Sequence, residues 1–393
     1  MKTKQLPTGW KEKKICEFTE VITGGTPSTI KKEYWENGNI SWLPSGDLKD
    51  KPIKSAHIFI TNEGLKNSSA QIMPKKSVLI ALTGATTGQT AILEIEASAN
   101  QSVTGILPSK EHIPKFLFYY LRTIRNKILN QTYGGAQPHI SQGFVKNVKI
   151  PLPPLPIQKQ IVSILEKAEK LKQRREKADK LTKEYLKSVF YEMFGDKGFE
   201  EKKLGEVCLK ITDGTHITPK YVDNGVPFLR VTDITESNSS KKFISPEEHK
   251  ELIKRCKPEK GDILYTKNGT IGIAKTIDWD YKFSIFVSLC LIKSKKELLL
   301  PKYLEFFLNT PYALRQAASH SKKGTIINLH LIEIKKIKIP LPPLPLQQKF
   351  ANIVEKVEKL KEKQKQSKEE INIMFDALMQ KAFKGELVKD GKK

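Results

Sequence analysis

Cysteine is scarce in this chain of 393 residues: there are four, and none lies in a C-x-x-C pair or beside a histidine cluster. Structural zinc sites are built from such closely spaced ligands, and disulfide scaffolds are short chains rich in cysteine. Neither kind of structure is therefore indicated. We expect Cys16, Cys208, Cys256 and Cys290 to be reduced thiols in the protein core.

Long apolar runs are also absent. No stretch approaches the roughly 20 apolar residues that a membrane-spanning helix needs. Residues 1–14 lack the apolar core of a signal peptide. We therefore expect a cytoplasmic protein without a membrane partner.

The familiar catalytic signatures are missing as well. The sequence has no Walker A loop, no dinucleotide-binding fingerprint, no zinc-protease motif and no nucleophile elbow. The proline pairs that begin at Pro153 and Pro342 are flanked by leucine. An amino-methyltransferase would have a polar residue before the pair and an aromatic residue after it, to hold a flipped base. We therefore expect a chain that is not an enzyme, with an unrecognised catalytic motif as the alternative.

Positive charge is in excess, with 68 Lys and Arg against 43 Asp and Glu and a formal net charge of +25. Such a charge favours a polyanionic partner, either nucleic acid or an anionic membrane. Two long segments share most of the excess, and no basic tail dominates, as expected if both segments lie along one polyanion. A basic surface that only keeps the protein soluble is the alternative.

One motif occurs twice. Lys-Ile-Pro-Leu-Pro-Pro-Leu-Pro stands at residues 149–156 and again at 338–345, an offset of 189 residues. Proline fixes φ and biases the preceding residue toward extended backbone, so each copy predicts a stiff strut. After each strut, apolar residues recur at alternating spacings of four and three, the pattern of a coiled-coil helix. We predict helices over residues 157–194 and 346–384.

The apolar stripe of each predicted helix needs a partner, because its side chains stabilise the helix only when they are covered. The other copy is the obvious partner. Packing against the helix's own domain or against another subunit is the alternative, and the residues leave the helix orientation open. The residues predicted to pair the helices or to dock other subunits are Ile161, Ile164, Leu171, Phe350, Ile353 and Leu360.

The segments before the two struts have short apolar runs broken by Gly, Pro, Asn and Ser, as is typical of mixed domains. Their framework is repeated, because Gly25-Thr26 matches Gly214-Thr215 and Trp42-Leu43 matches Phe228-Leu229, while the residues between differ. One fold used twice to bind two different targets would give this pattern. We predict an α+β protein. Its mixed α/β globular domains span 1–148 and 197–337, and its strut and helix segments span 149–196 and 338–393.

Positive loops with interleaved aromatic residues are the candidates for contact with nucleic acid. Lys and Arg would bind phosphates, and Gln, Asn, Thr or Arg would contact base edges. A solvated surface is the alternative for each loop. The candidates are Lys31, Lys32, Tyr34, Thr86, Thr87, Gln137 and His139 in the first segment, and His216, Lys220, Arg230, Lys267, Asn268, Thr270, Lys322, Lys323 and Thr325 in the second.

Asp213-Gly214-Thr215-His216 is the most site-like cluster, because Asp and His are common metal ligands and proton-transfer residues. A turn with Asp-Gly and a capping hydroxyl is the structural alternative. A loop that faces DNA is the functional alternative. We assign neither a catalytic residue nor a metal site to the chain.

With its two struts and two helices, the chain resembles the specificity subunit of a type I restriction–modification system. The resemblance covers nearly the whole chain as domain, helix, domain, helix. Its strongest signs are Ile150-Pro151-Leu152-Pro153-Pro154-Leu155 followed by Gln158, and Ile339-Pro340-Leu341-Pro342-Pro343-Leu344 followed by Gln347. The family often has Glu before this Gln, where this chain has Ile157 and Leu346. The departure concerns one local capping contact.

The resemblance implies that residues 1–148 and 197–337 are target recognition domains, each reading one half of a bipartite, asymmetric site in double-stranded DNA. It implies that the helices pair as an antiparallel coiled coil, fix the spacer between the half-sites and dock two methyltransferase subunits. The subunit would catalyse nothing and bind no cofactor. Partner subunits would supply adenine-N6 methylation with S-adenosylmethionine, and restriction subunits would supply cleavage with ATP and Mg. A helical scaffold whose basic domains bind RNA or protein is the alternative function.

Overall fold

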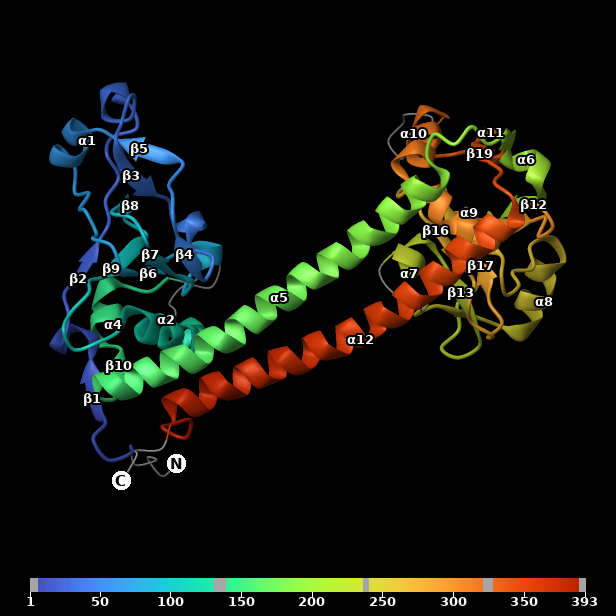
Figure 1. Ribbon diagram of the computed structural model, residues 1–393. Helices are drawn as coiled ribbons and strands as arrows, with labels where there is room; N and C mark the ends of the chain where they lie inside the picture. The colour runs from blue at the N-terminus through green and yellow to red at the C-terminus, as the bar shows by residue number, and fades with distance from the viewer. Residues whose placement is uncertain (1–5, 131–138, 236–239, 321–327, 389–393) are drawn as a thin grey trace. The chain divides into compact units, whose positions relative to one another are not determined.

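The structure is a computed structural model that describes residues 6–130, 139–235, 240–320 and 328–388. The chain divides into two compact units. The first unit is Met1–Glu176 with Lys365–Lys393, and the second unit is Lys177–Gln364. Each unit combines one globular domain with part of each of two 40-residue helices, α5 (Leu155–Phe194) and α12 (Leu344–Phe383) (Figure 1). Both helices lie within two residues of the predicted bounds.

The first domain contains two β-sheets with the strand orders β2-β9-β6-β7-β4 and β5-β3-β8. All four residues of β6 are fully buried, as expected for a central strand with both faces covered. The strands are β2 (Val21–Thr23), β3 (Ile40–Leu43), β4 (Lys51–Ile53), β5 (Ile58–Ile60), β6 (Val78–Ala81), β7 (Thr90–Leu93), β8 (Ser98–Ala99) and β9 (Val103–Ile106).

The second domain repeats this plan with the strand orders β12-β18-β15-β16 and β14-β13-β17. In both domains the smaller sheet contains a parallel pair, because Trp42 of β3 lies opposite Ser98 and Phe228 of β13 lies opposite Ser284. The strands are β12 (Cys208–Asp213), β13 (Val226–Leu229), β14 (Phe243–Ile244), β15 (Ile263–Thr266), β16 (Ala274–Thr276), β17 (Ser284–Ile285) and β18 (Leu289–Ser294).

The structural repeat corrects one detail of the sequence repeat. Gly24 and Gly214 are the equivalent glycines, because a Cβ on either would collide with the carbonyl oxygen of Ala99 or Ile285 respectively. The match of Gly25 to Gly214 is therefore off by one residue. Both positions need glycine because the backbone of a strand in the parallel pair passes so close that no side chain fits.

Short helices cover the sheets, and those with proline in the first turn begin as the sequence suggests. Tyr119 and Arg122 of α2 both bond to Glu169 of α5, at 2.8 and 2.9 Å, which attaches the domain to the long helix. The helices are α1 (Asn62–Lys66), α2 (Pro114–Thr123), α3 (Arg125–Leu129) and α4 (Gln142–Asn147) in the first domain, and α6 (Leu204–Val207), α7 (Val231–Thr235), α8 (Pro246–Arg255), α9 (Pro301–Leu308), α10 (Pro311–His320) and α11 (Leu331–Lys336) in the second.

The struts are β-strands. In the first unit β10 (Lys149–Leu152) pairs antiparallel with β1 (Lys11–Lys14), and in the second unit β19 (Lys338–Pro340) pairs antiparallel with β11 (Glu201–Lys203). Each sheet has only two strands, so its prolines lie where no further strand requires an N–H donor. The strut therefore enters its helix from a fixed position on the domain.

Gln158, in the first turns of α5, is fully buried and binds three backbone groups. Its Nε2 donates to the carbonyl oxygens of Pro153 at 2.8 Å and Glu111 at 3.0 Å, and its Oε1 accepts from the backbone N of Ile113 at 2.8 Å. The side chain thereby joins the strut, the start of α5 and the residue before α2.

Gln347 makes the same three bonds in the second unit. Its Nε2 donates to the carbonyl oxygens of Pro342 and Leu298, both at 2.9 Å, and its Oε1 accepts from the backbone N of Leu300 at 2.9 Å. The glutamine that follows each proline motif is thus a buried joint between helix and domain.

The two helices pair antiparallel. In the first unit, the early residue Ala168 of α5 shares a core with the late residues Phe375 and Met379 of α12. In the second unit the late residue Phe190 of α5 packs on the early residue Phe350 of α12, with ring centroids 5.3 Å apart. An antiparallel arrangement is the one that brings early residues of one helix against late residues of the other in both units.

The residues predicted to pair the helices or to dock subunits are covered near the domains and exposed farther along the helices. Ile161 and Phe350 are buried, and Ile164 and Ile353 are half-buried, but Leu171 and Leu360 are 42% and 46% exposed. The contact face follows Ala168 and then Lys172, whose Nζ lies 4.7 Å from the ring centre of Phe375. A straight α-helix drifts by about 20° per heptad relative to a strict seven-residue pattern, so such a pattern leaves the contact face within a few turns.

Three cysteines are core thiols as expected, and Cys16 is not. Cys208, Cys256 and Cys290 are buried, and burial raises the pKa of Cys208 to about 12 and that of Cys256 to about 11. Cys16 is exposed because its neighbour Ile15 takes the buried position of this short 3-10 turn.

Candidate nucleic-acid interface

In the first domain, the turn after β6 lies beside the segment that precedes α4. Thr83 and His139 form an isolated β-bridge, which brings the Gly84–Thr86 turn next to His139. Thr86 is half-buried and His139 is exposed, so these two predicted residues share one edge. Thr87 is only 1% exposed and its hydroxyl donates to the Gly84 carbonyl at 2.8 Å, so it shapes the turn and does not face solvent. Gln137 lies outside the described residues.

Lys31, Lys32 and Tyr34 lie on and beside a 3-10 turn of the first domain. Both lysines are exposed, as phosphate contact requires, whereas Tyr34 is 6% exposed and belongs to the core. The Nζ of Lys31 donates to the Tyr34 hydroxyl at 3.0 Å and lies 4.9 Å from the ring centre. This hydrogen bond raises the pKa of Lys31. Tyr34 therefore positions Lys31 and offers no ring to a base.

A buried carboxylate gathers three basic side chains in the second domain. Asp213, the last residue of β12, is 3% exposed. Its Oδ1 accepts a hydrogen bond from Nη2 of Arg255, and its Oδ2 lies 3.3 Å from Nζ of Lys267 and 3.2 Å from Nε2 of His216. A buried carboxylate is strongly unfavourable unless such partners surround it. Because two cationic side chains meet one carboxylate, the cluster is positive even when His216 is neutral.

An open cleft of about 490 Å³ adjoins this cluster, and Asn268 and Asn328 also line it. The two asparagines form an isolated β-bridge equivalent to that between Thr83 and His139. Within the described part of the chain, the Oδ1 atom of each is buried and has no hydrogen-bond partner. A buried acceptor left unpaired costs about 1–3 kcal/mol, so these oxygens suit donors on a bound molecule.

Of the other predicted residues in the second domain, Lys267 is the one that the structure corrects. It is 4% exposed and its ammonium is bound to Asp213, so it is not free to contact a phosphate. Arg230 is half-buried, with Nε 3.5 Å from Asp233. The exposed candidates are His216, Lys220 and Thr270, and Lys322, Lys323 and Thr325 lie outside the described residues.

Arg255 is the residue of this cluster that the sequence does not reveal. It is the last residue of α8, and 42 positions separate it from Asp213. No local motif connects the two residues, and only the fold brings them together. The cluster Asp213-Gly214-Thr215-His216 was the available signal, and its carboxylate is the centre of the site.

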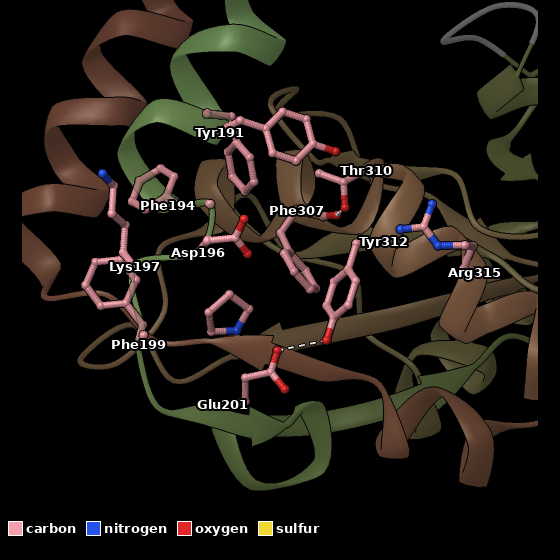
Figure 2. A pocket seen from close by; sticks show the side chains of 14 residues that line it. Tyr191, Phe194, Asp196, Lys197, Phe199, Glu201, Phe307, Thr310, Tyr312 and Arg315 are labelled. Carbon is pink, nitrogen blue, oxygen red and sulfur yellow. Dashed lines mark hydrogen bonds between the residues drawn. The ribbon is translucent and has the colours of Figure 1, made fainter.

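A second cavity of about 660 Å³ lies where α5 ends in the second unit. Figure 2 shows aromatic rings around it, and the Tyr312 hydroxyl donates to Oε1 of Glu201 at 2.8 Å. The described lining residues include neither His nor Cys. Charged side chains such as Asp196 and Arg315 line this cavity together with the aromatic rings.

Metal-binding clusters and membrane-spanning helices are both absent from the described residues. No group of three or more His, Cys, Asp or Glu side chains is placed to bind a metal ion there. No described helix is long and apolar enough to cross a membrane.

The repeat corresponds to a known domain used twice. The family model described as the type I restriction modification DNA specificity domain matches residues 7–182 and again residues 196–372. The chain belongs to this family. Each match of the specificity domain includes one globular domain and most of the long helix that follows it.

Specificity subunits of an archaeon and of a bacterium are similar to the chain along almost its whole length. The MjaIX type I restriction enzyme specificity subunit of Methanocaldococcus jannaschii is 28% identical over 414 residues, covering 98% of this chain and 94% of that protein. The EcoKI specificity subunit of Escherichia coli K12 is 25% identical over 429 residues, covering 98% and 91%.

Solved structures from type I restriction–modification systems share the fold. A chain from a study of complex assembly and conformational transition in a type I R-M system has a TM-score of 0.66 at 21% identity, and the match covers 98% of this chain and 100% of that one. The S subunit from M. genitalium has a TM-score of 0.52 at 15% identity, with 98% of each chain covered. The α+β architecture with two long helices is therefore that of the family.

Proposed function

We propose that this chain is the DNA-reading subunit of a type I restriction–modification complex. Residues 1–148 and 197–337 are its target recognition domains, and each binds one half of a bipartite site in double-stranded DNA. The observation that carries the proposal is the double match to the specificity domain within one chain. The net charge of +25 suits a duplex partner, and the subunit acts in the cytoplasm with the chromosomal DNA.

The DNA site is asymmetric, because the two domains present different side chains at equivalent positions. Beside the equivalent turns, the first domain has Thr83 and His139 where the second has Asn268 and Asn328. A threonine and histidine pair differs from two asparagines in its hydrogen-bonding groups, so the two edges favour different bases.

The paired helices set the spacer between the half-sites. Buried Gln158 and Gln347 attach each helix to its own domain through three hydrogen bonds. A helix of 40 residues is about 60 Å long at 1.5 Å per residue, which suits a rigid spacer. The spacer length is therefore a property of the helix segments and not of the recognition loops.

The same helices dock two methyltransferase subunits through exposed apolar side chains. Leu171 and Leu360 occupy equivalent positions 189 residues apart, as do Tyr185 and Met374, and all four are exposed. The chain therefore offers one apolar surface twice. The subunit itself catalyses nothing and holds no cofactor. Methyltransferase partners bring S-adenosylmethionine for adenine-N6 methylation, and restriction subunits bring ATP- and Mg-dependent cleavage.

Replacing one domain tests the proposal. The chain is co-expressed with its methyltransferase subunit, and the methylated motif is read by sequencing the genome. In a second version of the chain, residues 197–337 are replaced by the corresponding domain of another specificity-domain protein. We expect one half of the motif to change while the other half and the spacer stay the same. A motif that changes in both halves, or in neither, contradicts modular reading. The alternative, a scaffold that binds RNA or protein, predicts no methylated motif at all.

A further inference from the structure

We propose that the cleft beside Asp213 is a binding site for the major-groove edge of a guanine, with Arg255 as the residue that reads it and Asp213 as the residue that positions Arg255. The inference rests on the proposed function, since it names one base contact within the second half-site. It assigns a contact to a residue that is remote from every recognised motif of the chain.

Arg255 is held at both ends and still open to a ligand. Its backbone carbonyl accepts a hydrogen bond from Nζ of Lys210 at 2.6 Å, and its Nη2 donates to the buried Oδ1 of Asp213. The side chain nevertheless remains 56% exposed and lines the cleft. A guanidinium has five N–H donors in one plane, so fixing one nitrogen leaves a rigid set of donors for a bound group.

Beside Arg255 the cleft suits an acceptor-rich edge, because donors and surplus positive charge meet there, whereas the unpaired Oδ1 atoms of Asn268 and Asn328 in the same cleft suit a donor such as the N4 amine of the cytosine paired with that guanine. Arg255 and Lys267 contribute two positive charges against the single carboxylate of Asp213. Guanine presents two acceptors, N7 and O6, at the spacing of the arginine fork. A phosphate would satisfy the charge equally well. A phosphate contact would not need a guanidinium fixed by a buried carboxylate, whereas base reading requires this fixed geometry.

The site belongs to the second domain alone. Thr23 precedes the close-approach glycine Gly24 in the first domain, where Asp213 precedes Gly214 in the second. The Leu82 carbonyl in the first domain and the Lys267 carbonyl in the second accept equivalent backbone hydrogen bonds, so these two residues occupy equivalent positions. In the first domain, the uncharged residues Thr23 and Leu82 therefore occupy the positions of Asp213 and Lys267, which form an ion pair in the second domain. The guanine is therefore read in one half-site only.

The test uses the chain in complex with its methyltransferase subunit and a duplex carrying the motif found by methylome sequencing. For each guanine of the second half-site, binding is measured by fluorescence anisotropy with guanine or with 7-deazaguanine, which lacks the N7 acceptor. The variants are Arg255→Ala, Arg255→Lys and Asp213→Asn, and Lys254→Ala is the control. Lys254 is the preceding residue on α8, exposed and bound to Glu251 at 2.6 Å.

We expect one guanine at which 7-deazaguanine weakens wild-type binding by roughly fivefold or more, within the range of a bidentate contact. Arg255→Ala should abolish that sensitivity, Arg255→Lys and Asp213→Asn should reduce it, and Lys254→Ala should keep it. Equal weakening of all duplexes by Arg255→Ala, with the sensitivity intact, would mean a phosphate contact and overturn the assignment. If the wild-type complex prefers no sequence, the proposed function itself fails. Melting temperatures of the variants would establish that they are folded before their binding is compared.

Discussion

Gln364 of α12 donates a hydrogen bond from Nε2 to Oγ1 of Thr182 on α5, at 2.9 Å, and both side chains are buried. Thr182 in turn donates to the carbonyl oxygen of Ala178 at 2.9 Å. This polar pair interrupts an otherwise apolar contact between the helices of the second unit. A buried polar pair is satisfied in one register only, so it specifies how the helices align.

The first prediction concerns this pair. Thr182→Val should lower the free energy of unfolding by about 1–3 kcal/mol, because the buried amide of Gln364 loses its acceptor. Thr182→Val combined with Gln364→Leu should be less destabilised than Thr182→Val alone, since no buried polar group is then left unpaired. Urea unfolding of the four members of the double-mutant cycle measures the coupling. Strictly additive losses would show that the bond does not contribute to pairing.

The second prediction concerns the joints at Gln158 and Gln347. Either glutamine replaced by alanine leaves a buried backbone N–H and two carbonyl oxygens without the side chain that binds them. We expect each substitution to destabilise its own unit by about 2–4 kcal/mol. The two losses should be similar, because the bonds are the same in both units. Thermal unfolding measures them.

Gln348 supplies the matched control for this prediction. It is the next residue along α12, is exposed, and its side chain donates to the nearby Asn352 side chain at 2.9 Å. Gln348→Ala should change stability by less than about 0.5 kcal/mol. If it were as destabilising as Gln347→Ala, the loss could not be assigned to the buried joint, because alanine favours a helix at least as well as glutamine does.

The helices, their ends and the repeat could be predicted from the sequence because local chemistry sets them. Prolines fix the struts, a sustained apolar pattern fixes the helices, and Gly195 follows the last turn of α5. The course of the pairing face far from the domains could not be predicted. Leu171 and Leu360 fit the heptad and are nevertheless exposed, because the real contact face follows the drift of a 3.6-residue helix.

Polarity selected loops that the fold brings to shared edges, but it did not show which side chains in them are exposed. Lys267 and Thr87 are polar residues on Gly-rich turns, and both are buried. Lys267 is bound to Asp213, which is distant in sequence, whereas Thr87 bonds within its own turn. Arg255 lay beyond prediction because its partner Asp213 is distant in sequence. A candidate interface can thus be located from composition, whereas the orientation of each side chain depends on tertiary contacts.

The third prediction concerns the exposed apolar surface of the helices. Leu171→Ser and Leu360→Ser should each leave the stability of the isolated chain within about 0.5 kcal/mol, because these side chains are exposed. Both should weaken binding of the methyltransferase subunit, measured by calorimetry, because docking would bury them. The double variant should lose the binding of both methyltransferase subunits. Unchanged affinity in all three variants would place the docking surface elsewhere.

The fourth prediction is a pH dependence centred on His112. Its ring is 3% exposed and packs edge-on against Phe18, and burial lowers its pKa to about 4. The unfolded imidazole has a pKa near 6.5. Between pH 4 and pH 6.5 the His112 imidazole is protonated in the unfolded chain but not in the folded chain. The stability that the neutral imidazole contributes above pH 6.5 is therefore lost as the pH falls toward 4.

Replacing His112 by Phe should reduce the loss of free energy of unfolding between pH 7 and pH 4 by on the order of 2 kcal/mol. Chemical denaturation at a series of pH values measures the change in slope. The same substitution also removes the bond between Nδ1 and the Ser109 hydroxyl, so a constant offset above pH 7 is expected and is not the signal. A slope equal to that of the wild type would show that another group controls acid stability.

The fifth prediction is the salt dependence of DNA binding and how single lysines contribute to it. The logarithm of the association constant should fall linearly with the logarithm of the salt concentration, with a slope of about −0.9 for each phosphate contacted. Lys32 and Lys220 are exposed candidates, one in each domain. Lys32→Ala and Lys220→Ala should each reduce the slope by about 1 and weaken binding to all sequences alike. Arg255→Ala should instead act mainly through its one guanine. A lysine variant with an unchanged slope would remove that residue from the interface, and an association constant independent of salt would contradict DNA binding by the basic domains.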